Sequence, residues 1–123
     1  MEIYESSEDY LEMMLMLHQE KGYIRSTDIA AALGVTKPSV SYAVKRLREN
    51  GYITMAADGE ISLTDSGMEI AARTYEKHKV ITGFLISLGV SKETAYHDAC
   101  KIEHDISEES FNALVKYAAS IKK

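Results

Sequence analysis

Apolar positions in the first part of the chain recur at helical spacing and predict three helices. The first should cover residues 7–21 and carry its acidic side chains on the polar face. Its apolar stripe consists of Tyr10, Leu11, Met14, Leu15 and Leu17. A short second helix should follow Ser26, a candidate N-cap, and end at a turn formed by Gly34. Thr36 should cap a third helix that ends before Gly51.

The segment after the third helix has the pattern of a small β-hairpin. Residues 52–55 and 61–63 are expected to be short strands, with an Asp58-Gly59 turn between them. Two helices joined by a tight turn, the second with a polar and basic outer face, are typical of a helix-turn-helix. Because a hairpin follows directly, the sequence predicts a winged helix, whose third helix enters the major groove of DNA.

The second half of the chain is expected to be entirely helical. A long helix should run from Thr64 to about Leu88, where Gly89 breaks it. Two further helices should cover residues 92–104 and 108–121, each directly preceded by a serine that can act as its N-cap. The apolar side of the last helix is formed by Phe111, Leu114, Val115 and Ala118.

These elements predict a mainly α protein with two domains. A winged helix-turn-helix DNA-binding domain should occupy residues 1–73, and an all-helical domain should occupy residues 74–123. No repeat or flexible linker separates the halves, so the expected boundary lies inside the long helix.

Composition and charge narrow the function classes. A single cysteine, Cys100, excludes an intramolecular disulfide and leaves a free thiol. Neither a long uncharged apolar run nor a signal-like N-terminus is present, so we expect a cytoplasmic protein without a membrane span. The net charge of -5 argues weakly against nucleic acid, but four basic residues cluster within about a dozen positions in the third helix. They are Lys37, Lys45, Arg46 and Arg48.

The outer face of the third helix offers hydroxyls and cations that suit phosphates and base edges. The candidate DNA-binding residues are Thr36, Lys37, Ser39, Ser41, Tyr42, Lys45 and Arg46. A solvated basic helix has a similar composition, and the winged-helix context favours DNA binding. Since no catalytic triad order, phosphate-binding glycine loop or H-E-x-x-H motif is present, we expect that the protein is not an enzyme.

Two groups of side chains have the residue types of metal ligands. Cys100, Glu103 and His104 lie three and four positions apart, so a thiol, a carboxylate and an imidazole share one helix face. Asp9 and Glu12 form a second same-face pair that suits a divalent ion. Taken separately, each group also has a plain structural explanation, as a core cysteine, a helix-terminal histidine or solvated acids.

Together these features resemble the DtxR/MntR family of metal-dependent repressors over nearly the whole chain. The segments that carry the resemblance are Glu8-Asp9-Tyr10-Leu11-Glu12, residues 27–41, the hairpin with Leu63-Thr64-Asp65-Ser66-Gly67, Lys77-His78, and residues 99–107. The resemblance implies that the metal ligands are Asp9, Glu12, His78, Cys100, Glu103 and His104. All six have donor atoms, which unrelated surface positions would rarely provide together. The chain ends soon after its sixth helix and resembles the short form of the family, without a C-terminal SH3-like domain.

The resemblance also implies a mechanism. Residues 74–123 would bind metal and form a homodimer, which would bind a palindromic operator and repress metal-uptake genes with a divalent ion as corepressor. Asp9 and Glu12 resemble the manganese-responsive branch, whereas Cys100 resembles the iron-responsive branch. Because a thiolate is softer than a carboxylate, we expect Fe(II) to be favoured over Mn(II), with Co(II) and Zn(II) also able to bind.

The chain departs from the iron-responsive branch at that branch's accessory metal site. An acid is expected one turn after His78 and a histidine near position 96, where this chain has Thr82 and Tyr96. His97, one position away, is either a substitute ligand or, as is more common, a solvated histidine. Two other functions stay open, namely a metal-independent winged-helix regulator that responds to a small molecule or protein partner, and a metal-dependent hydrolase. The sequence offers no general base or substrate pocket for the hydrolase.

Overall fold

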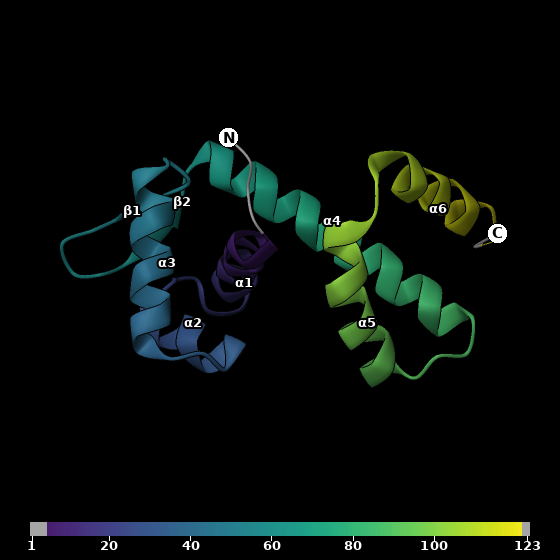
Figure 1. Cartoon of the computed structure of the whole chain (residues 1–123), viewed down its shortest axis with the longest axis horizontal. Coiled ribbons are helices and arrows are strands. Elements are labelled where there is room, and N and C mark those ends of the chain that lie inside the picture. Colours follow the sequence, from purple (N-terminus) through teal and green to yellow (C-terminus); the bar gives the residue numbers. More distant parts are fainter. Residues whose placement is uncertain (1–4, 122–123) are drawn as a thin grey trace. The chain divides into compact units, whose positions relative to one another are not determined.

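The computed structural model describes residues 5–121, which form six α-helices and one antiparallel β-hairpin in that range (Figure 1). The elements are, in chain order, α1 (Glu5–Lys21), α2 (Ser26–Leu33), α3 (Lys37–Glu49), β1 (Ile53–Met55), β2 (Ile61–Leu63), α4 (Asp65–Ser87), α5 (Lys92–Asp105) and α6 (Glu108–Ile121). This order confirms the predicted mainly α fold with a winged helix-turn-helix. The chain divides into two compact units, Met1–Ala72 and Arg73–Lys123, and α4 contributes residues to both.

The first unit surrounds one apolar core. α1 buries the stripe predicted from its sequence, and α2, α3 and the hairpin add branched aliphatic side chains. The largest fully buried side chains of the unit are Leu11, Met14, Ile24, Ile29, Val40, Ile53 and Ile61. Burying each of them stabilises the fold by about 1.5–3 kcal/mol relative to exposure. The inner side of α3 packs against this core, and its outer side is exposed to solvent.

The starts of α2 and α3 differ in how well the sequence predicted them. Thr36 caps α3 as expected, because its side chain accepts a hydrogen bond of 3.3 Å from the backbone N–H three residues later. The prediction that Ser26 caps α2 is wrong, since Ser26 lies inside the helix and Arg25 is the N-cap residue. The cause is tertiary: the carbonyl of Ile24 accepts from the N–H of Ile61, which keeps the chain extended up to Arg25.

The hairpin forms the wing. β1 pairs with β2 in antiparallel register, with Ile53 opposite Leu63 and Met55 opposite Ile61. Ile53 and Ile61 are buried, so this register turns one apolar face of the hairpin onto the core.

A close backbone approach joins the end of the wing to the start of α4. The hydroxyl of Thr64 donates to the carbonyl of Gly51 at 2.7 Å and accepts from the N–H of Gly67 at 3.2 Å. At Gly67 only glycine fits, because a Cβ there would lie 2.0 Å from the carbonyl oxygen of Tyr52. Gly67 is therefore a packing requirement of the first unit.

The second unit consists of the rest of α4 with α5 and α6. Ser91 and Ser107 accept hydrogen bonds from backbone N–H groups three residues later, at 3.3 and 3.1 Å, so both cap their helices as predicted. Lys77 of α4 forms an ion pair of 3.2 Å with Glu108 at the start of α6. On the apolar side of α6, Phe111 is buried, whereas Val115 is 39% exposed in the single chain.

Within residues 5–121, no helix combines the length and the unbroken apolar character needed to cross a bilayer.

Candidate metal centre and DNA interface

The second unit contains a buried group of donor side chains on α4 and α5. Nδ1 of His78 lies 2.9 Å from Oε2 of Glu103, and the two side chains are 6% and 0% exposed. Sγ of Cys100 lies 3.8 Å from the same imidazole nitrogen. The structure therefore brings three of the four candidate ligands of this unit together.

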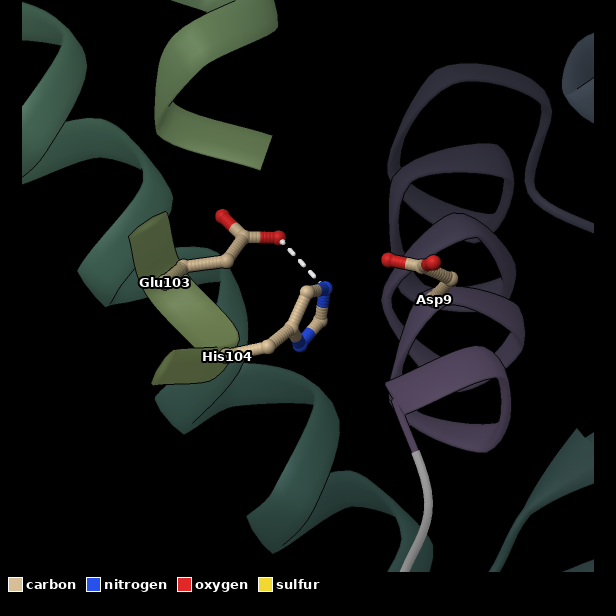
Figure 2. A group of neighbouring side chains, drawn as sticks. All are labelled: Asp9, Glu103 and His104. Atoms are coloured by element: carbon tan, nitrogen blue, oxygen red, sulfur yellow. Dashed lines mark ion pairs between the residues drawn. The ribbon is translucent and has the colours of Figure 1, made fainter. Parts of the chain in front are cut away.

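The fourth candidate ligand, His104, lies on the other side of the Glu103 carboxylate. Its Nε2 is 3.5 Å from Oε1 of Glu103, and its side chain is 2% exposed (Figure 2). One buried carboxylate thus lies between the imidazoles of His78 and His104. A buried carboxylate is costly unless charge or hydrogen bonds compensate it. The His78 ring is the hydrogen-bond partner of Oε2, whereas the buried Oε1 has no hydrogen-bond partner among the residues that the structure describes. The alternative that Glu103 is a solvated charge does not hold. We call His78, Cys100, Glu103 and His104 the donor cluster.

The donor cluster offers a nitrogen that has no hydrogen-bond partner within the described residues 5–121. Among the residues that the structure describes, Nε2 of His78 is buried and has no hydrogen-bond partner, and neither has Oγ1 of Thr82 one turn later. Buried polar atoms are nearly always satisfied, so such an atom points to an external partner. Imidazole, thiol and carboxylate are the donor types that divalent transition metals bind. The residues present therefore fit a metal ion.

Tyr96 is a neighbour of the donor cluster that sequence reasoning did not include. Its ring meets that of His78 edge to face, with centroids 4.5 Å apart and planes at 76°. It lies one turn before Cys100 on α5, a spacing that could have placed it on the same face. His97 is exposed, and its described ring contact is with Tyr96, at 6.0 Å, rather than with a donor.

The first unit holds the two remaining candidate ligands on α1. Asp9 is half-buried and projects from the side of α1 (Figure 2), and Glu12 is 7% exposed. Their spacing of three residues places them on one helix face. A solvated acidic face, the plain alternative for this pair, does not describe Glu12.

The outer face of α3 is exposed at every position predicted to bind DNA. These positions are Thr36, Lys37, Ser39, Ser41, Tyr42, Lys45 and Arg46. Tyr42 is the most prominent, at 63% exposed, and its hydroxyl accepts a hydrogen bond of 3.1 Å from Nη1 of Arg46. The guanidinium carbon of Arg46 also lies 5.8 Å from the ring centre, so the two side chains form one aromatic and cationic surface. Such a surface suits phosphates and bases.

Two of the hydroxyls on this face already have a structural role. Oγ1 of Thr36 accepts from the backbone of Ser39 and donates to its hydroxyl at 2.9 Å. Thr36 is the N-cap residue of α3 and Ser39 is its partner in the first turn, so substitution of either would affect the helix as well as any contact with DNA.

A further contact in the first unit was not foreseen. The guanidinium of Arg25 reaches Asp58 at the tip of the wing, 33 positions along the chain, with Nη1 2.8 Å from the Asp58 carbonyl oxygen. Neither spacing nor residue type signals such a pair, because it depends on how the hairpin packs against the α1–α2 loop.

Comparison with known proteins shows that two domain models of one family match the two halves of the chain. The N-terminal DNA binding domain of the iron dependent repressor family matches residues 2–60. The metal binding and dimerisation domain of the same family matches residues 64–123.

Individual relatives agree with this match. The transcriptional regulator MntR of Salmonella typhimurium is 38% identical over 110 residues, which are 89% of this chain and 70% of that protein. The HTH-type transcriptional regulator MntR of Bacillus subtilis is 38% identical over 109 residues, 89% and 77% of the two chains. Because these relatives are transcriptional regulators, the prediction that the protein is not an enzyme is confirmed.

Solved structures share the fold. The manganese regulator SloR has a TM-score of 0.82 at 28% identity and matches 92% of this chain and 53% of its own. IdeR from T. acidophilum has a TM-score of 0.81 at 28% identity and matches 97% of this chain and 55% of its own. The present chain thus spans about half the length of these two structures. With both of its halves matched by one family and MntR proteins as its relatives, the chain belongs to the iron-dependent repressor family, the DtxR/MntR regulators.

Proposed function

We propose that the protein is a metal-dependent, DNA-binding transcriptional repressor whose corepressor is a divalent ion. The observation that supports it most is the buried donor cluster, which lies in the half of the chain that matches a metal binding domain. Nδ1 of His78 lies against a carboxylate and a thiol, and Nε2 on the other side of the buried ring has no hydrogen-bond partner among the described residues, which packing alone does not explain.

The proposed ligand set combines the donor cluster with Asp9 and Glu12 of α1. We assign DNA binding to residues 1–73 and metal binding and dimerisation to residues 74–123. When bound, a divalent ion supplies positive charge and a fixed coordination geometry for these donors. The carboxylates of α1 and the side chains of α4 and α5 would then hold a common partner, which restricts how the two domains move. By linkage, the ion favours the DNA-competent state only by its difference in affinity for the two states.

On the DNA side, the seven exposed positions of α3 are the proposed contacts. Lys37, Lys45 and Arg46 would bind phosphates or guanines, and the hydroxyls would bind phosphates and base edges. Two copies would pair through the second domain and present two α3 helices to a palindromic operator. We propose that the protein acts in the cytoplasm and that it represses genes for metal uptake.

Two observations bear on the identity of the ion. The thiol of Cys100 favours Fe(II) over Mn(II), because a softer ligand binds the metal later in the divalent series more strongly. The relatives are named as MntR, and the structure of SloR as that of a manganese regulator, which points to manganese. We propose Fe(II) from the ligand chemistry, with Mn(II) as the direct competitor.

A titration of DNA binding under anaerobic conditions tests function and ion together. The probes are a duplex selected by the protein from a random-sequence pool and an unselected duplex of equal length, each with Fe(II), Mn(II), Co(II) or Zn(II). We expect one or more ions to tighten binding to the selected duplex. His104→Ala should remove that stimulation while the helical circular dichroism is retained, and His97→Ala, an exposed histidine on the same helix, is the matched control.

Two results of this titration would contradict the proposal. Binding to the selected duplex that is the same with and without every ion would favour a metal-independent winged-helix regulator. Stimulation that survives in His104→Ala would place the metal site elsewhere.

A further inference from the structure

The tip of the wing is held by a side chain from outside the hairpin. Nη1 of Arg25 donates to the carbonyl oxygen of Asp58 at 2.8 Å, and Nη2 lies 3.5 Å from its carboxylate. The next residue, Gly59, lies against the same guanidinium, since a Cβ built there would be 3.7 Å from Nη1. One arginine thus binds Asp58 through its carbonyl and its carboxylate, and its guanidinium lies next to the open side of Gly59.

The segment that carries Arg25 also pairs with the first residue of β2. The N–H of Ile61 donates to the carbonyl of Ile24 at 2.9 Å. On its other side, the carbonyl of Arg25 accepts from the N–H groups of Asp28 and Ile29 in the first turn of α2. Arg25 therefore links the wing tip directly to the first helix of the helix-turn-helix.

The charge of the wing makes this link important for DNA binding. Residues 53–63 contain Asp58 and Glu60 and neither Lys nor Arg. Next to phosphates, an uncompensated acidic tip would be repelled. The backbone N–H of Glu60, and further the charge of Arg25, hold the pKa of the Asp58 carboxyl below its usual value, so the tip stays ionised.

We propose that Arg25 is a positioning residue for operator recognition. Its bonds to Asp58 fix the wing relative to α3 and compensate the acidic tip, so that the wing can approach the DNA together with the recognition helix. This inference rests on the proposed function. The competing explanation is that Arg25 binds a phosphate directly and that its contact with the wing is incidental.

The test compares Arg25→Ala with Lys21→Ala in the full chain. Lys21 is the matched control, since it is an exposed cation of the same region whose ammonium bonds Asp28 on α2, at 3.1 Å. The first measurement is hydrogen exchange at the hydrogen-bonded wing amides of Ala56 and Gly59 in the free protein. The second is fluorescence anisotropy with the selected and the unselected duplex, in Mn(II) or Fe(II), over a range of salt concentrations.

We expect Arg25→Ala to speed exchange at both wing amides and to weaken binding to the selected duplex about threefold to tenfold, the factor that one hydrogen bond of ordinary net strength provides. Its salt dependence should stay that of Lys21→Ala, and the unselected duplex should be affected less. Arg25→Lys, which retains the charge but not the two-pronged contact, should recover only part of the loss.

Two results would overturn the inference. One is an Arg25→Ala protein that matches Lys21→Ala in wing exchange and in affinity. The other is unchanged wing exchange with a salt slope reduced by about one, which identifies a phosphate contact. If the wild-type protein binds neither duplex with any ion, the proposed function fails, whereas the exchange measurement still decides whether Arg25 holds the wing.

Discussion

The outer face of α3 in the first unit and the donor cluster in the second place their polar side chains in opposite environments. In the first unit, the polar and cationic side chains of α3 lie in solvent, and the residues that maintain the fold, such as Val40 and Val44, lie behind them. In the second unit, His78 and Glu103 are themselves buried, so the same side chains determine packing and the proposed chemistry. Fold and function should therefore be separable by substitution of the exposed cations of α3 and coupled at His78 and Glu103.

Gly67→Ala should cause the largest loss and affect the fold alone. The new Cβ would lie 2.0 Å from the Tyr52 carbonyl oxygen, so backbone must shift, at a cost of about 3 kcal/mol. The measurement is thermal unfolding by circular dichroism. Gly83→Ala is the matched control, because it also adds a methyl to α4 where nothing lies within 4 Å, and it should stabilise the protein by about 0.5–1 kcal/mol. Equal melting temperatures for the two variants would contradict the close approach.

Glu103→Gln should affect stability and metal affinity together. The amide keeps the shape of the side chain but removes the charge that lies between His78 and His104. We expect the free energy of unfolding to fall by about 1–3 kcal/mol and metal affinity to fall by about 100-fold. Denaturant unfolding without metal and calorimetry with Mn(II) measure the two effects. A Glu103→Gln protein that loses only stability, or only metal affinity, would contradict the coupling of fold and function at this side chain.

Lys45→Ala should change DNA binding and leave the fold unaffected. Lys45 is exposed on α3, so unfolding should shift by no more than about 0.5 kcal/mol. Affinity for duplex DNA should fall, and the slope of its salt dependence should decrease by about one. Lys92→Ala, an exposed lysine of the second unit, serves as control. An unchanged slope would remove Lys45 from the phosphate contacts.

Cys100→Glu should have the smallest effect on affinity and act mainly on the order of the metals. Exchange of a thiol for a carboxylate makes the donor cluster harder, so the preference should move toward Mn(II), by about tenfold or less. Competitive binding of Fe(II) and Mn(II) in anaerobic buffer measures the shift. If the order of the metals is unaltered, the thiol does not take part in selectivity.

Local signals in the sequence were sufficient for most of the fold. Helix starts were predicted correctly at Thr36, Ser91 and Ser107. A hydroxyl oxygen at such a position can accept a hydrogen bond from the N–H three residues later in any tertiary setting. The failures depend on distant contacts. Ser26 was displaced as a cap by the pairing of Ile24 with the hairpin, which no window around Ser26 contains.

The donor cluster was foreseen only in part for the same reason. Helical spacing places Cys100, Glu103 and His104 on one face, but His78 entered through the family resemblance, since it lies on another helix. The edge contact of Tyr96 with His78 was missed because it depends on how α4 and α5 pack. The roles of these residues as metal ligands stay predictions that the experiments above address.

The hydrogen bonds at the foot of the wing limit how far a change in the hairpin can affect the rest of the first unit. The Thr64 hydroxyl bonds the carbonyl of Gly51, and the N–H of Thr64 bonds that of Tyr52, so the chain is tied where the hairpin leaves α3 and where it rejoins α4. A loop closed at its base can change length or sequence with little effect on what lies below it. A change in the length of the turn, residues 56–60, should therefore leave the neighbouring helices in place, whereas Ile53 and Ile61 are fixed by the core.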